Sequence, residues 1–428
     1  MSGGVKAGWF SALAVSGLML GGVSAQAADL GGDCCSDLEE RIADLEATTA
    51  RKGNRKVSLA ISGWVNEAVF FWDDGTERNV YIGTNTLEQS RFKFAGEAKI
   101  DKDWSAGYTL EVGVAGAASS TFSQSSTGTS TSLTLRKSNW YLKSKTYGKL
   151  TVGLDGTSTY HLLDDADGAN TRNYSDAEAA RVALGAFGLR SGGSAAAAGN
   201  LTWGNIMAGY NNGTPGQDGR RNIVKYDSPE FGGFVASVSW GEDDLWDTSL
   251  SYKGELHDFK IVGRIGYGES TDPAATNCTG PASGFKCTWW GAAGTVMHAP
   301  TGLYLYAGYG EQKIESLPGS LDDTSTTWFI QPGIERKWHP IGKTTIFGEY
   351  RKDDAGALFS GTSNTATLNS QGADLTHYAG GIVQSIDAAA MDLYVIYRHS
   401  EGDFINKAGT KVGLDDFDMV ISGARIQF

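Results

Sequence analysis

The feature that most constrains the fold of this chain is a long alternation of apolar and polar residues that starts near Lys56. In its clearest segment, Phe92, Phe94, Gly96, Ala98 and Ile100 alternate with Arg91, Lys93, Glu97 and Lys99. Successive side chains of a strand point to opposite faces, so this strand has one apolar and one charged face. The pattern returns in residues 57–71, 261–267, 303–309 and 391–398. It predicts an all-β fold.

The connections between the predicted strands alternate in length. Long connections are rich in Gly, Ser, Thr and Asp, and the short ones between them lie near Asp101, Tyr147, Ser228, His257, Thr301, Pro340 and Ala388. Bacterial membrane barrels join their strands by short turns at one end and long loops at the other. The count gives about 16 strands. We therefore predict a transmembrane antiparallel β-barrel over residues 56–428, ending on the aromatic Phe428.

The first 27 residues have the pattern of an export signal. A positive charge at Lys6 precedes an apolar run from Trp9 to Val23, and Ala25-Gln26-Ala27 is a cleavage site for signal peptidase. No later stretch reaches the roughly 20 apolar residues that a membrane helix needs. The mature chain is expected to begin at Ala28, and it is either a barrel or a soluble exported protein.

Residues 28–55 differ from the rest of the chain. Here apolar residues recur at spacings of three and four, at Cys35, Leu38, Ile42 and Leu45. This spacing is typical of a coiled-coil seam. Because so short a helix is marginal alone, we expect it to be supported by other copies in an oligomer, on the periplasmic side.

The four cysteines form two local pairs. Cys278 and Cys287 flank a Gly- and Pro-containing loop, and an exported chain meets an oxidising compartment, so a disulfide is favoured over a metal site. Cys34 and Cys35 are the second pair of disulfide candidates. Whether they link neighbouring helices is left open.

Charge and motifs exclude several classes of function. The net charge of −13 and the absence of a basic patch argue against nucleic-acid binding. No G-x-S-x-G or H-E-x-x-H motif is present, so an enzyme is not expected, although a Ser and a His brought together across strands stays an alternative. No cofactor and no metal are predicted. The acidic balance indicates a weak preference for cations if the chain forms a pore.

The run from Asp37 to Glu46 followed by Ala50 to Val57 resembles the amino-terminal signature of the porins of alphaproteobacteria. The segments Tyr147 to Gly153 and Tyr226 to Phe234 resemble parts of porins in general. The resemblance implies sixteen strands, a homotrimer in the Gram-negative outer membrane, and passive diffusion of small hydrophilic solutes. It also implies that the third extracellular loop folds inward and narrows the channel.

The longest connection, residues 156–200, occupies the place of that loop. Its candidate constriction residues are Asp164, Asp165, Asp167, Arg172, Asp176, Glu178 and Arg181. The facing wall is expected to present Arg91, Lys93, Arg136, Arg221, Arg264 and Arg398. Carboxylates opposite arginines would set up a transverse field that polar solutes cross more readily than apolar ones.

Partners and alternatives follow from this interpretation. An outer-membrane barrel is surrounded by lipid and lipopolysaccharide, and the barrel assembly machinery inserts it, with Phe428 as the terminal signal. One alternative function is a substrate-specific channel with a binding site in the lumen. Another is a tether to peptidoglycan through Ala28, as in some members of the family.

Overall fold

The computed structural model describes residues 56–128, 132–175, 179–196, 201–207, 214–242, 244–271, 286–315, 317, 319–360 and 367–428. The predicted signal peptide and the coiled-coil seam Cys35, Leu38, Ile42 and Leu45 lie outside these residues. Cys34, Cys278 and Ala28 lie outside them as well. Those predictions therefore stay predictions.

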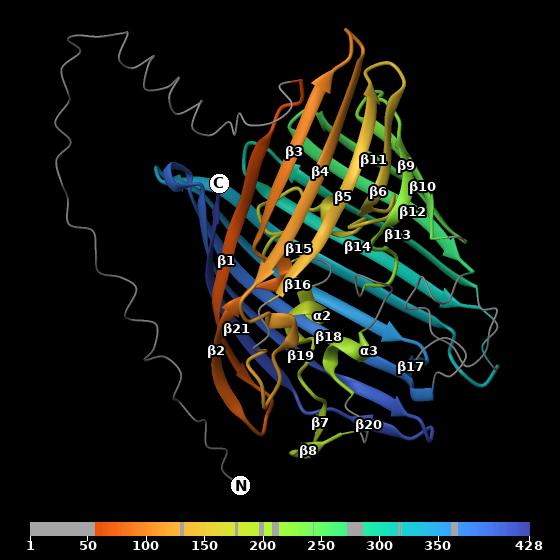
Figure 1. Ribbon diagram of the computed structural model, residues 1–428. Helices are drawn as coiled ribbons and strands as arrows, with labels where there is room; N and C mark the ends of the chain where they lie inside the picture. Colours follow the sequence, from red (N-terminus) through yellow and green to blue (C-terminus); the bar gives the residue numbers. More distant parts are fainter. Residues whose placement is uncertain are drawn as a thin grey trace, which may run out of the picture. The chain divides into compact units, whose positions relative to one another are not determined.

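The described chain forms a closed antiparallel barrel (Figure 1). Its strands are β1 (Ala60–Asp73), β2 (Arg78–Thr84), β3 (Arg91–Lys99), β4 (Trp104–Ala115), β5 (Ser132–Ser144), β6 (Gly148–Gly156), β9 (Arg220–Asp227), β10 (Phe234–Gly241), β11 (Leu245–Leu256), β12 (Phe259–Ser270), β13 (Cys287–His298), β14 (Leu303–Ile314), β15 (Thr324–His339), β16 (Gly342–Ala355), β17 (Leu358–Ser360), β18 (Thr367–Ile386), β19 (Met391–Asn406), β20 (Lys411–Gly413) and β21 (Phe417–Gln427).

Nineteen strand segments make sixteen barrel strands. β2 and β3 both pair with β1 and together form one wall strand, while β17 continues β16 against β18 and β20 lies beside β19 as β21 does. The barrel closes where β1 pairs with β21, from Trp64 opposite Gln427 to Asp73 opposite Asp418. The predicted fold, an antiparallel barrel of sixteen strands, is confirmed.

All seven predicted short turns are present, and they lie at one end of the barrel. They join β3 to β4, β5 to β6, β9 to β10, β11 to β12, β13 to β14, β15 to β16 and β18 to β19. The start of β1 and the end of β21 both lie at this turn end, where the N–H of Gly63 donates to the carbonyl of Phe428 at 2.9 Å. The opposite end carries the long loops.

The outer face of the barrel is apolar, because every second strand residue points away from the lumen. Exposed side chains on this face include Val65, Ile265, Leu305, Ile382 and Val395. Aromatic residues such as Trp240, Trp290 and Trp328 are exposed there too. A soluble protein rarely exposes so much continuous apolar surface. The surface fits contact with lipid. None of the described helices is long and apolar enough to cross a membrane.

The long connection between β6 and β9, residues 157–219, is called the inner loop here. It contains η3 (Asp164–Ala166), α2 (Ala179–Leu184), the short strands β7 (Arg190–Ser191) and β8 (Ser194–Ala195), and α3 (Trp203–Ile206). It extends further than the predicted end near residue 200. The reason is that Thr202 caps a turn of helix through a capping box with Asn205, so the wall resumes only at Arg220.

Inside the barrel, part of the wall is apolar. Phe70, Trp72, Phe417, Met419 and Ile421 point inward from β1 and β21 and are buried. They belong to one cluster with Leu184, Phe187, Trp203 and Ile206 of the inner loop. Burial of apolar area here favours docking of the loop within the lumen. A polar cavity remains beside β3–β5 and β9–β12, and none of its lining residues belongs to this cluster.

Candidate functional site

The inner loop is attached to the wall from its first residues. The carboxylate of Asp247 on β11 accepts hydrogen bonds from the backbone N–H of Ser158 at 3.0 Å and of Thr159 at 2.7 Å. Trp289 on β13 donates its indole N–H to the hydroxyl of Thr159 at 2.9 Å. Tyr306 on β14 then donates to the carbonyl of Leu163 at 2.7 Å.

The attachment continues strand by strand towards β19. The N–H of Asn170 donates to Glu335 on β15 at 2.9 Å, and Tyr174 donates to Asp392 on β19 at 2.7 Å. The hydroxyl of Ser175 donates to Glu349 on β16 at 3.0 Å. Residues 158–175 thus cross the lumen along the wall from β11 to β19.

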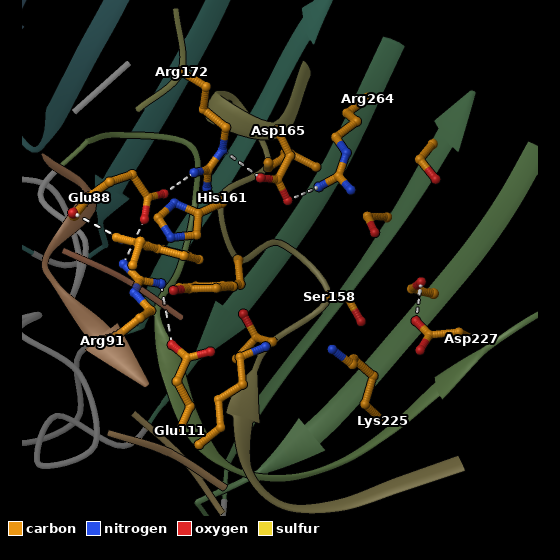
Figure 2. Close-up of a pocket in the computed structure, with 18 residues that line it drawn as sticks. Glu88, Arg91, Glu111, Ser158, His161, Asp165, Arg172, Lys225, Asp227 and Arg264 are labelled. Atoms are coloured by element: carbon orange, nitrogen blue, oxygen red, sulfur yellow. Dashed lines mark hydrogen bonds and ion pairs between the residues drawn. The ribbon is translucent and has the colours of Figure 1, made fainter. Parts of the chain in front are cut away.

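An ionic chain lies on the free side of the loop, at the predicted constriction (Figure 2). Arg91 on β3 pairs with Glu88 of η1 (Thr86–Glu88) at 2.6 Å, and Glu88 also contacts Arg172 of the inner loop. Arg172 pairs with Asp165 at 2.8 Å, and Asp165 reaches Arg264 on β12 at 3.1 Å. Cations and carboxylates therefore alternate from one wall to the other.

Arginines hold the loop carboxylate of this chain ionised. Burial alone would raise the pKa of Asp165, but the guanidinium groups of Arg172 and Arg264 override it and lower the pKa. Asp165 therefore keeps its charge across the physiological pH range.

The cavity beside this chain has a volume of about 530 Å³ and a polar lining. Glu111 lies next to the ionic chain, 3.2 Å from Arg91. The lining also includes Lys137, Lys225 and Asp227, together with hydroxyl groups of Ser158, Tyr160, Ser237, Ser249 and Ser251. Figure 2 shows Lys225 and Asp227 across the cavity from Glu88 and Arg91. The site can orient dipolar solutes and replace part of their hydration, and it contains no arrangement of nucleophile and base.

A β-bulge sets the charge of the wall at β5. Glu111 pairs with Lys137, whereas the next residue of β4, Val112, pairs with Leu135, so Arg136 is one extra residue on the strand. Arg136 bonds Glu111 at 2.8 Å, and Lys137 bonds Asp155 on β6 at 2.7 Å. A bulge redirects side chains in this way. Two consecutive cations consequently lie on the inner face.

The structure places the predicted constriction residues in different surroundings. Asp165 and Arg172 lie in the ionic chain, but Asp164 is fully buried, with its Oδ2 2.6 Å from His161 Nδ1. Asp167 is bonded to Thr171 away from that chain. Asp176, Glu178 and the side chain of Arg181 lie outside the described residues.

The predicted wall residues divide in the same manner. Arg91 and Arg264 line the cavity. Arg136 does not line it, but it forms an ion pair with Glu111, which does. Lys93 lies on the same face as Arg91, two residues further along β3. Arg221 is buried between Asp218 and Glu242 at the loop end. Arg398 faces inward but is covered by the inner loop, where it bonds Glu349 at 2.9 Å.

Several channel residues were not predicted from the sequence. Glu88, Glu111 and Lys225 line the cavity, and only the alternation around them could have indicated that they face inward. Lys137 was missed because the bulge breaks that alternation. Cys287 is disulfide-bonded. Since every other cysteine lies outside the described residues, the pairing with Cys278 stays a prediction.

Asp167 gives the inner loop a predicted pH dependence. Burial raises the pKa of Asp167 to about 7, even though Thr171 and the N–H of Ala169 donate to its carboxylate. An aspartate in the unfolded chain has a pKa of about 3.9, so stability is lost as the pH rises from about 4 through 7. We expect the free energy of unfolding of the detergent-solubilised barrel, obtained from urea titrations, to fall by about 2–3 kcal/mol between pH 5 and pH 8.

Asp167→Asn serves as the matched comparison. Asparagine keeps an acceptor for Ala169 and a polar group for Thr171, but it does not titrate. The urea midpoint of the Asp167→Asn variant should be the same at pH 5 and pH 8. It should exceed the midpoint of the unmodified protein only at pH 8. An equal decline in both proteins would assign the pH dependence to other groups.

A closed barrel with an inward loop and a charged constriction defines a channel-forming protein of the membrane. A family model described as Gram-negative porin matches residues 12–413. The chain therefore belongs to the Gram-negative porin family, whose members are outer-membrane channels and not enzymes. The match does not distinguish the alphaproteobacterial branch.

Solved structures share the fold at low sequence identity. An anion-selective porin from Comamonas acidovorans has a TM-score of 0.59 at 15% identity, covering 87% of this chain and 100% of its own. OmpT of Vibrio cholerae, folded in vitro, has a TM-score of 0.51 at 15% identity, covering 88% and 99%. OmpF of Salmonella typhi, in complex with daunomycin, has a TM-score of 0.50 at 13% identity, covering 87% and 98%. No curated protein matches the chain.

Proposed function

We propose that this porin is a water-filled channel for the passive diffusion of small hydrophilic solutes and ions. The observation that carries the proposal is the ionic chain from Arg91 to Arg264 beside an open polar cavity. Alternating fixed charges polarise the water in the constriction. Polar solutes exchange hydrogen bonds there, whereas apolar solutes must displace ordered water.

The assembled state and the orientation belong to the same proposal. We propose a homotrimer in which the short turns and the amino-terminal segment face the periplasm and the long loops face outward, as bacterial barrels are built. The exposed apolar outer face is consistent with contact to both lipid and neighbouring subunits. Lipopolysaccharide and the barrel assembly machinery are the further expected partners.

Single-channel recording tests the proposal. Purified, refolded protein in a planar bilayer should give open, ohmic conductance steps with closures in groups of three. A silent bilayer from a folded, heat-modifiable barrel would overturn the diffusion function. A tether through Ala28 would then be favoured, and muramidase digestion would reveal it as a mass change at the amino terminus.

A substrate-specific channel is the second candidate. The hydroxyl groups of Ser237, Ser249 and Ser251 along one wall favour it, because they could replace the hydration shell of a particular solute. Saturable flux of that solute would support this candidate, and flux linear in concentration would support general diffusion. The weak cation preference expected from the whole-chain charge is not part of this proposal, since selectivity depends on the charges of the channel wall.

A further inference from the structure

The part of the channel wall that the inner loop leaves uncovered carries positive charge, whereas the chain as a whole is negative. The whole chain has a net charge of −13. Yet the inner face of β3–β6 and β11 presents lysines that make no ion pair within 4.0 Å of a carboxylate among the described residues: Lys93, Lys99, Lys143, Lys149 and Lys253.

Register places these lysines on the lumen side. Lys93 and Lys99 share the face of Arg91, which lines the cavity. The Lys149 ammonium lies 4.7 Å from the centre of the Tyr141 ring. The hydroxyl of Tyr141 in turn reaches Glu97, on the same face of β3.

The lumen-facing positions of Lys143 and Lys253 follow from those of neighbouring residues. Lys143 is the direct cross-strand partner of both Ser105 on β4 and Lys149 on β6. Lys253 lies two residues beyond Ser251, a residue that lines the cavity.

One pair is electrostatically unfavourable for the barrel itself. Lys143 and Lys149 lie directly opposite each other, and like charges at such positions destabilise a sheet. Stability of the sheet therefore gives no reason for two facing ammonium groups. Their repulsion is relieved whenever an anion passes between or near them.

Part of the acidic excess of the chain lies outside the channel. Asp374, Glu401 and Asp418 have exposed side chains on the outward face near the loop end. In the channel, Glu88, Glu111, Asp155 and Asp165 each pair with at least one cation. Glu97 and Asp227 instead accept hydrogen bonds from Tyr141 and Ser237, and these two carboxylates are fewer than the five lysines. Neutralised carboxylates contribute little to the field along the axis.

We propose that the channel prefers small anions, such as inorganic anions and carboxylates, and that the unpaired lysines between the constriction and the turn end cause this preference. The inference rests on the proposed function and specifies its solute class. The lysines raise the local concentration of anions in a narrow, low-dielectric passage. Several weak sites in succession let an anion enter without being retained.

The test is the reversal potential of single channels under a KCl gradient. We expect the sign that marks chloride as more permeant than potassium, by a few-fold. Open channels with a potassium-type reversal potential would overturn this inference and leave the diffusion function standing. Complete silence would overturn the diffusion function and this inference with it.

A charge-matched pair of variants locates the cause. The wall variant replaces four lumen lysines by glutamine: Lys93→Gln, Lys143→Gln, Lys149→Gln and Lys253→Gln. The control removes the same charge from ion pairs outside the lumen: Lys286→Gln, Lys313→Gln, Lys352→Gln and Lys411→Gln.

The wall variant should shift the permeability ratio towards potassium by at least about twofold, and the control should not. Both conductance and heat-modifiability confirm that each variant is folded. Equal shifts in the two variants, or no shift in the wall variant, would contradict the proposal.

Discussion

Gly310→Val should displace the returning end of the inner loop from the wall towards the lumen and narrow the channel. Gly310 on β14 and Gly291 on β13 are direct partners, and both lack a side chain where Pro215 and Gly216 run against the wall. A Cβ at Gly310 would clash with the carbonyl of Pro215. Overpacking of this kind costs about 1–3 kcal/mol.

The effect has two measurable parts. The single-channel conductance should fall, because the displaced loop would occupy more of the lumen, and the urea midpoint should fall as well. Gly263→Val on β12 is the control, since a Cβ there meets no atom within 4 Å. It should leave both quantities unchanged. A Gly310→Val barrel with unchanged conductance would show that this contact does not position the loop.

Arg398→Met should destabilise the barrel more than any outward substitution. Arg398 is 1% exposed, bonds Glu349 at 2.9 Å and donates to Ser175 of the inner loop at 3.0 Å. Removing it leaves the carboxylate of Glu349 buried without its partner. Breaking a buried pair in this way costs about 3–5 kcal/mol. The midpoint of urea unfolding measures the loss.

Two further variants show whether loss of the ion pair between Arg398 and Glu349 causes the loss of stability. The double variant Arg398→Met with Glu349→Gln removes the orphaned charge and keeps an acceptor for Ser175, so it should recover part of the stability. Lys352→Met on the outward face breaks an exposed pair with Asp374 and should change stability by no more than about 1 kcal/mol. If the double variant were as unstable as Arg398→Met, size and packing would explain the effect and charge would not.

The wall could be predicted from the sequence, because strand geometry alone decides which residues face inward. Arg91 and Lys93 point inward and Phe92 points outward for that reason. The same rule found Arg398 on the inner face. It could not indicate that Arg398 is covered, since coverage depends on where residues 157–219 pack.

The path of the inner loop was not predictable, because it has no periodicity. Its position is determined by contacts with distant residues, such as Asp247 with Thr159 and Glu349 with Ser175. For the same reason Asp164 and Asp165 could not be told apart in the sequence, although only Asp165 reaches Arg264. Consecutive carboxylates in a loop can have entirely different surroundings.

The bulge at Arg136 has an evolutionary consequence. If Arg136 were deleted, Leu135 and Lys137 would become consecutive residues that already face Val112 and Glu111, so every other pairing of β5 could persist. The chemistry of the passage can thus change by gain or loss of a single codon, with the surrounding architecture conserved. Related channels with different solute preferences could diverge by such length changes as readily as by substitution.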